Sequence, residues 1–144
     1  MKKILSMFLV ALMLIGLVGC GSKNTVTFEG YEWKLTFIQS NKDGSIIGCA
    51  SEHYEAHKDI GNIIVVDLIC SAENGNFVIT DNTNNTKYSG TYTAIDESTE
   101  NILYDIAAST NKGTAVSSVT KDDRGSETPT LIITIGDYSL NFQS

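Results

Sequence analysis

The feature that most constrains this chain is a period-two alternation of apolar and polar residues. It recurs in several separate runs, namely residues 31–37, 77–80, 88–93, 102–106, 131–135 and 138–142. Successive side chains of a β-strand point to opposite faces, so this pattern is typical of half-buried strands. In the first run it predicts that Trp33, Leu35 and Phe37 share one face. No long run with helical periodicity is found, and we therefore expect an all-β protein.

Composition supports this interpretation. From Cys20 onward, 15 Thr, 14 Ile and 6 Val account for 35 of 125 residues. Branching at Cβ suits a pleated sheet better than a helix. The whole chain is 42% hydrophobic and 19% charged, which excludes a disordered tail and a multi-span membrane protein.

Turn-forming residues separate the apolar runs. Asn74-Gly75 is a strong hairpin signal, and Asn111-Lys112-Gly113 and Gly136-Asp137 indicate further tight turns. The strands expected between these turns are 31–39, 45–50, 62–71, 76–81, 86–95, 101–109, 114–120 and 130–142, the last divided at Gly136. Residues 51–59 begin with Ser51 and carry acids early and Lys58 late, as a short helix does. We predict an antiparallel up-and-down barrel of about eight strands with one short helix, since closure removes exposed edges.

The N-terminus predicts export. Lys2 and Lys3 precede an apolar run from Ile4 to Val18 of about 15 residues, which is shorter than the ~20 that span a bilayer. The run ends in Leu17-Val18-Gly19-Cys20, which resembles the bacterial lipobox. That resemblance implies a signal peptide over 1–19, a diacylglyceryl group on Cys20 and a cell-membrane protein, lipid-anchored on the extracytoplasmic face. Residues 20–29 then form the lipidated end and its tether, and 30–144 form the barrel domain.

The net charge of the chain limits the classes of molecule that it can bind. The formal net charge is −7, and cleavage after Gly19 would make it −9 because Lys2 and Lys3 are lost. A protein this acidic is unsuited to binding nucleic acid and is repelled by anionic lipid headgroups. The lipid chains at Cys20 must therefore hold the protein to the membrane. Whether the host has one membrane or two stays open.

The stretch Gly30-Tyr31-Glu32-Trp33 at the first strand, followed by a string of antiparallel strands, resembles lipocalin-like lipoproteins of Firmicutes. Lipocalins proper carry Gly-x-Trp here, whereas this chain has Gly-x-x-Trp. META-type envelope domains have a similar first-strand Trp. The lipocalin resemblance implies a barrel that takes a small apolar or amphipathic ligand at one mouth, with Trp33 closing the other.

Aromatic side chains on the inner face are the candidate ligand-binding residues. They are Trp33, Phe37, Tyr88, Tyr92 and Tyr104. The alternative is that these rings, with the inward aliphatic residues, fill an eight-stranded interior and leave at most a shallow pocket.

Two cysteines remain besides Cys20. In an oxidising compartment, Cys49 and Cys70 would form a disulfide if strand register brings their Cα atoms within ~7 Å. Otherwise they are small buried thiols.

The two histidines, His53 and His57, lie one helical turn apart and would reach a common Zn²⁺, but no third ligand has the required spacing. A solvated polar helix is the simpler interpretation. No nucleophile, phosphate-loop or paired-carboxylate motif is present, so we expect no enzyme and no cofactor.

The sequence thus predicts a non-catalytic, lipid-anchored binding protein at the cell surface. The alternative is a protein-interaction or envelope-structural module, such as an inhibitor of a secreted hydrolase, whose acidic surface would steer a basic partner.

Overall fold

The computed structural model describes residues 25–97 and 100–144. The predicted signal peptide and Cys20 lie outside these residues. The elements are β1 (Trp33–Ser40), β2 (Ile46–Cys49), η1 (Ser51–His53), α2 (Tyr54–His57), β3 (Ile64–Val65), β4 (Leu68–Glu73), β5 (Asn76–Asp81), β6 (Thr86–Asp96), β7 (Ile102–Ala108), β8 (Asn111–Lys121), β9 (Glu127–Ile135) and β10 (Tyr138–Gln143). Within the described ranges, no helix has the length and apolar character needed to cross a membrane.

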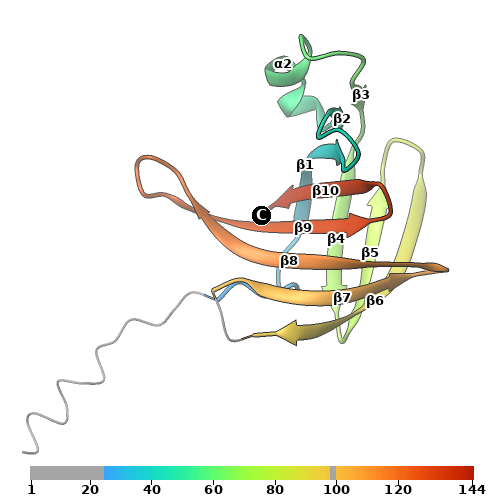
Figure 1. Cartoon of the computed structure of the whole chain (residues 1–144), viewed down its shortest axis with the longest axis vertical. Helices are drawn as coiled ribbons and strands as arrows, with labels where there is room; N and C mark the ends of the chain where they lie inside the picture. Colours follow the sequence, from blue (N-terminus) through green and yellow to red (C-terminus); the bar gives the residue numbers. More distant parts are fainter. Residues whose placement is uncertain (1–24, 98–99) are drawn as a thin grey trace, which may run out of the picture.

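Eight of the strands form a closed antiparallel barrel in the order β1-β4-β5-β6-β7-β8-β9-β10 (Figure 1). Closure comes from β10, whose residues from Tyr138 to Gln143 pair with Ser40 to Lys34 of β1. The predicted all-β barrel with one short helix is confirmed. As the turn at Gly136 predicted, the last expected strand divides into β9 and β10.

One expected strand and part of another lie outside the barrel, because residues 62–71, expected as one strand, divide into β3 and β4. Strand β2, predicted over 45–50, pairs with β1 only at Phe37–Gln39, and β3 pairs with β2 in parallel. The N-terminal end of β1 pairs instead with β4, through Trp33 and Lys34. One side of β1 is therefore shared between two strands, and the sheet forks. Residues 46–65, with η1 and α2, form an outer arm that stands above the barrel at the top of Figure 1.

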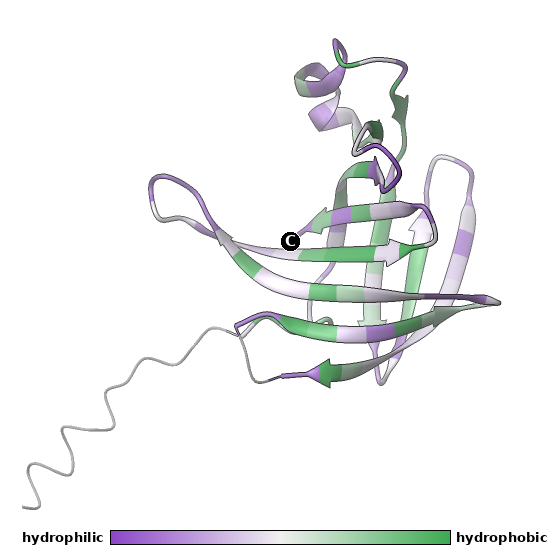
Figure 2. Ribbon diagram, viewed as in Figure 1, coloured by the Kyte–Doolittle hydropathy of each residue, from purple (hydrophilic) through white to green (hydrophobic). Residues whose placement is uncertain are grey.

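The barrel core follows from the alternation. Figure 2 shows apolar and polar residues interleaved along the barrel strands, and the inward members are buried. The buried cluster contains Val26, Phe28, Trp33, Leu35, Leu68, Cys70, Phe77, Ile79, Ile102, Tyr104, Ile106, Ala115, Leu131, Ile133 and Phe142. Removal of these side chains from water supplies the main stabilisation of the fold.

The expected alternation is wrong at Phe37. A β-bulge lies between Leu35 and Phe37 where β1 pairs with β10, and the Thr36 hydroxyl donates to the Asn141 carbonyl (2.9 Å). An extra residue on one strand shifts every later side chain to the opposite face. Phe37 therefore leaves the core face and lies beside the His57 ring of the outer arm, with ring centroids 6.1 Å apart.

Candidate ligand-binding site

One end of the barrel is closed by the chain itself. Residues 25–30, here called the N-terminal segment, precede β1 and were expected to belong partly to a tether. Instead Val26 is 3% exposed and Phe28 is fully buried. The Phe28 ring lies 4.7 Å from the Tyr92 ring and 5.5 Å from the Tyr104 ring, centroid to centroid. We call this the closed end.

Buried hydrogen bonds hold the N-terminal segment in place. The Ser117 hydroxyl donates to the Val26 carbonyl (2.6 Å), and the Tyr104 hydroxyl accepts from the Phe28 N–H (2.9 Å). The Trp33 indole Nε1 donates to the Phe28 carbonyl (2.9 Å). Backbone polar groups that enter a core need such partners, because an unpaired buried group costs as much as a lost hydrogen bond. Side chains from three barrel strands therefore provide the hydrogen-bond partners for these backbone groups of the N-terminal segment.

An acidic residue fixes the edge of the closed end. The Glu29 carboxylate accepts from the Tyr92 hydroxyl and from the Gly75 N–H (3.3 Å). The Tyr92 bond lowers the pKa of Glu29. Burial, followed by the bond to Glu29, raises the pKa of Tyr92 to about 12. Both groups thus keep their charge states at neutral pH, and the Tyr92 hydroxyl remains a donor.

The opposite end of the barrel is open and contains a cavity of about 430 Å³, which we call the mouth cavity. Most of its wall is apolar. The lining residues are Leu68, Phe77, Ile79, Lys87, Tyr88, Ser89, Ala108, Ser109, Asn111, Ile135 and Leu140. Apolar pockets of this size with a few polar groups are typical of small-molecule sites. Phe77 lies between the two ends of the barrel. Its ring lines the mouth cavity and also stacks on the Phe28 ring, with centroids 5.7 Å apart.

Strand stagger leaves the mouth cavity open on one side. The pairing of β6 with β7 begins at Thr91 and Ala107, whereas β6 itself starts at Thr86. The first part of β6 therefore extends past the β7–β8 turn and pairs only with β5. Lys87, Tyr88 and Ser89 lie on this overhang and belong to the lining. Tyr88 pairs with the buried Ile79 and lies on the inner face of the sheet, whereas Lys87 pairs with Thr80 and lies on the outer face. The cavity is therefore not covered by β7 on this side.

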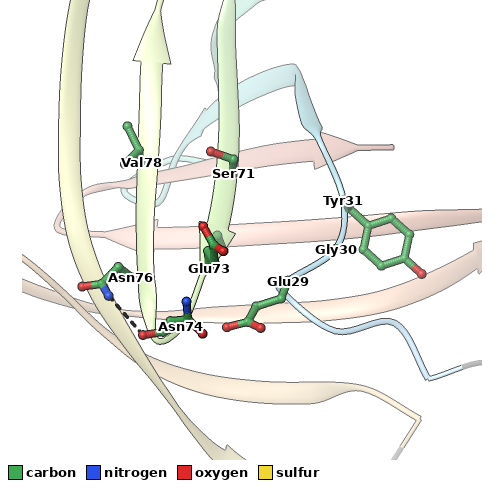
Figure 3. Close-up of a pocket in the computed structure, with 9 residues that line it drawn as sticks. Glu29, Gly30, Tyr31, Ser71, Glu73, Asn74, Asn76 and Val78 are labelled. Carbon is green, nitrogen blue, oxygen red and sulfur yellow. Dashed lines mark hydrogen bonds between the residues drawn. The ribbon is translucent and has the colours of Figure 1, made fainter.

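A second hollow, of about 690 Å³, lies near the closed end (Figure 3). It runs between the N-terminal segment and the β4–β5 hairpin, and its walls include Glu29, Glu73 and Asn74. Although it is larger, its walls are more polar, and Glu29 is already bonded to Tyr92 and Gly75. The mouth cavity is therefore the better site for an apolar ligand.

The five predicted ligand-binding aromatics are not brought together. Tyr88 lines the mouth cavity and is 53% exposed. Trp33, Tyr92 and Tyr104 contact the N-terminal segment at the closed end. Phe37 lies outside the barrel. Sequence reasoning missed Ser109 and Asn111, because only the closure of the barrel brings the β7–β8 turn to the same lining as Tyr88.

Cys49 and Cys70 are free thiols, and both are buried. Cys70 pairs with Trp33 and Cys49 pairs with Phe37, four positions further along β1. At ~3.3 Å per residue, this spacing separates the cysteines by about 13 Å, too far for a disulfide. Burial raises the pKa of Cys70 to about 12 and also raises that of Cys49.

The histidines lie on the outer arm. His53 Nε2 is 3.5 Å from a Glu52 carboxylate oxygen, and His57 packs against Phe37. Across residues 25–97 and 100–144, no three or more His, Cys, Asp or Glu side chains are grouped so as to hold a metal ion. The geometry therefore adds no ligand to the two that the sequence offered.

Comparison with protein-family models, with curated proteins and with solved structures finds no match to this chain.

Proposed function

We propose that this protein is a lipid-anchored, non-catalytic binding protein that takes a small apolar or amphipathic ligand into the mouth cavity. The observation that carries the proposal is the contrast within one barrel. The closed end is filled by Val26 and Phe28, while the mouth retains a cavity of about 430 Å³ with an apolar wall. A ligand that covers this apolar surface removes it from water, which lowers the free energy.

The position of the N-terminal segment supports an orientation. The described chain begins at Thr25, directly before Val26 of the closed end. Residues 20–24 reach at most about 18 Å when fully extended. A lipid on Cys20 would thus hold the closed end toward the membrane and leave the mouth facing away from it.

Fluorescence of N-phenyl-1-naphthylamine, a neutral apolar probe, tests the binding proposal. We expect saturable enhancement with wild-type protein. Ala108→Trp places an indole in the cavity and should reduce binding at least tenfold. Ala107→Trp is the matched control, because Ala107 is the adjacent residue of β7 and does not line the cavity. Equal binding by wild type and Ala108→Trp would contradict the proposal.

Metabolic labelling with an alkyne fatty acid tests the anchor. Labelling should be seen in wild type and lost in Cys20→Ser. An unlabelled wild-type protein would remove the anchor from the proposal and leave the mouth cavity unaffected.

The second hollow, shown in Figure 3, favours one alternative function, a protein-interaction module for a basic partner. Glu29 and Glu73 lie along it, and the chain as a whole carries a net charge of −7. Capture of a basic envelope protein that weakens with salt and with Glu73→Gln would support this alternative.

A further inference from the structure

We propose that the exposed edge of β6 binds an extended peptide segment of another protein, which pairs with the main chain of Lys87 and Ser89 and places an apolar side chain in the mouth cavity. The inference goes beyond the proposed function, because it assigns a protein partner and because a sheet edge contributes to binding as well as the cavity. It follows from the direction of the main-chain hydrogen-bonding groups of β6 and from the position of the cavity beside them.

The first part of β6 has one edge that no strand of the described chain covers. Residues 86–90 pair with β5, whereas pairing with β7 starts only at Thr91. In Figure 1 the β5–β6 hairpin accordingly rises above the turn between β7 and β8. We call the side of residues 86–90 that faces away from β5 the open edge. Such an edge is a template for a further strand, because its N–H and carbonyl groups lack a partner strand.

The register shows which residues present their main chain at the open edge. The Tyr92 N–H donates to the Gly75 carbonyl (2.9 Å), so the main chain of Tyr92 is directed to the β5 side. Residues of an antiparallel strand face their two neighbours alternately, and every second residue from Tyr92 back to Thr86 therefore bonds to β5. Lys87 and Ser89 lie between these residues and direct their N–H and carbonyl groups to the open edge. An antiparallel strand added here forms up to about four main-chain hydrogen bonds.

The mouth cavity lies directly beside the open edge. Lys87, Tyr88 and Ser89 belong to its lining, and so do Ser109 and Asn111 at the β7–β8 turn. Tyr88 lies on the inner face of the sheet and is 53% exposed. The peptide residue opposite Tyr88 forms a pair without hydrogen bonds, in which the two side chains lie closest together. An apolar side chain at this position therefore packs against Tyr88 and the apolar wall of the cavity.

Charge identifies the next residue of the peptide. The Lys87 side chain lies on the outer face opposite Thr80, is exposed, and forms no ion pair with another described residue. Opposite charges on directly opposed residues of two antiparallel strands attract, whereas like charges repel. An acidic residue opposite Lys87 is therefore complementary, and a Ser or Thr fits opposite Ser89. The expected partner is an extended segment with Ser or Thr, an apolar residue, and Asp or Glu in this order.

Fluorescence anisotropy with a labelled peptide tests the inference. The probe is acetyl-Thr-Leu-Glu-Thr-Gly with fluorescein on its C-terminal end, and the comparison peptide has Lys in place of Glu. We expect saturable binding of the Glu peptide to wild type and about fivefold weaker binding of the Lys peptide, because the latter opposes two like charges. Lys87→Glu should reverse this preference.

Lys34→Glu is the matched control for this substitution. Lys34 is an exposed lysine of β1, which β4 and β5 separate from β6, so the change in net charge is the same and lies away from the open edge. It should retain the preference for the Glu peptide. If Lys87→Glu also retains that preference, the proposed register is wrong.

Two N-methylated peptides test the main-chain pairing. A methyl group on the Glu nitrogen removes an N–H that bonds to β6 in the proposed register, and it should abolish binding. A methyl group on the Leu nitrogen replaces an N–H that points away from β6, so the affinity should stay within about twofold of the parent peptide. Equal affinities of the two methylated peptides would overturn the pairing.

Two further measurements separate this inference from its alternatives. Sedimentation velocity without peptide should show a monomer; a dimer that the peptide dissociates would assign the open edge to a second copy of the chain and overturn the inference. If N-phenyl-1-naphthylamine binds and neither peptide does, the inference fails and the proposed function stands. If the peptides bind as expected and N-phenyl-1-naphthylamine does not, the small-ligand function fails and the peptide site stands.

Discussion

The two ends of the barrel are made from the same eight strands and yet differ in what fills them. At the closed end the chain supplies its own occupant, with Phe28 fully buried among Phe77, Tyr92 and Tyr104. The mouth has no such occupant and retains a cavity. The eight strands alone therefore do not fill the interior of the barrel. The N-terminal segment, which is not one of these strands, determines which end is filled.

Polar groups mark the same difference. Tyr104 and Ser117 place hydroxyls inside the closed end because a segment with backbone N–H and carbonyl groups enters there. The mouth cavity is lined mainly by apolar side chains such as Leu68, Ile79 and Ile135, and no segment with backbone polar groups enters it. A side chain lost from the closed end should therefore affect stability, and one lost from the mouth should affect binding.

The largest effect is expected for Phe28→Ala. The change removes a fully buried ring with three aromatic neighbours and should lower the free energy of unfolding by about 3–5 kcal/mol. Tyr88→Ala is the comparison at the mouth; because Tyr88 is 53% exposed, it should cost less than about 1 kcal/mol. Urea denaturation monitored by Trp33 fluorescence measures both. Equal losses would mean that the two ends are energetically alike.

A smaller effect is expected at the boundary between the ends. Gly90 lies opposite Phe77 on β6, and a Cβ there would come within 2.4 Å of the Phe77 ring and 2.6 Å of the Ala107 carbonyl oxygen. Gly90→Ala should therefore lower the free energy of unfolding by about 1–3 kcal/mol through overpacking.

Because Phe77 also lines the mouth cavity, Gly90→Ala should change probe binding as well. Denaturation and N-phenyl-1-naphthylamine titration on the same preparation check both effects. A variant of wild-type stability with unchanged binding would show that Phe77 does not couple the two ends.

The smallest effect concerns pH and is confined to the closed end. The pKa of Glu29 is lowered from 4.5 in the folded protein, mainly by its hydrogen bond from Tyr92. Its ionised carboxylate therefore stabilises the fold fully above about pH 4.5, and this stabilisation is lost as the pH falls through the lower folded pKa.

Glu29→Gln should flatten the decline of unfolding free energy below pH 4.5 and leave N-phenyl-1-naphthylamine binding at the mouth unchanged. Denaturation midpoints from pH 3 to pH 7, with Glu73→Gln as a control carboxylate, measure this. A pH profile unchanged by Glu29→Gln would show that the N-terminal segment does not depend on this contact.

Some features were predictable from sequence because they depend on neighbours along the chain. The alternation over 131–135 and 138–142 predicted β9 and β10, and Gly136 predicted the turn between them. Val26 and Phe28 also alternate with Thr25 and Thr27, a signal for a buried extended segment that lies within the expected tether.

Other features could not be predicted, because they depend on which strands meet. The bulge that turns Phe37 outward is set by its pairing with β10, more than 100 residues away. The separation of Cys49 from Cys70 likewise depends on where β2 and β4 meet β1.

The sequence by itself determined that this chain folds as antiparallel strands with one apolar face each, because side-chain alternation and turn residues act over a few neighbouring positions. Only the tertiary structure decided which end of the barrel is filled and which is open. That outcome depends on strand stagger and on the path of residues 25–30, both of which are set by contacts between distant segments.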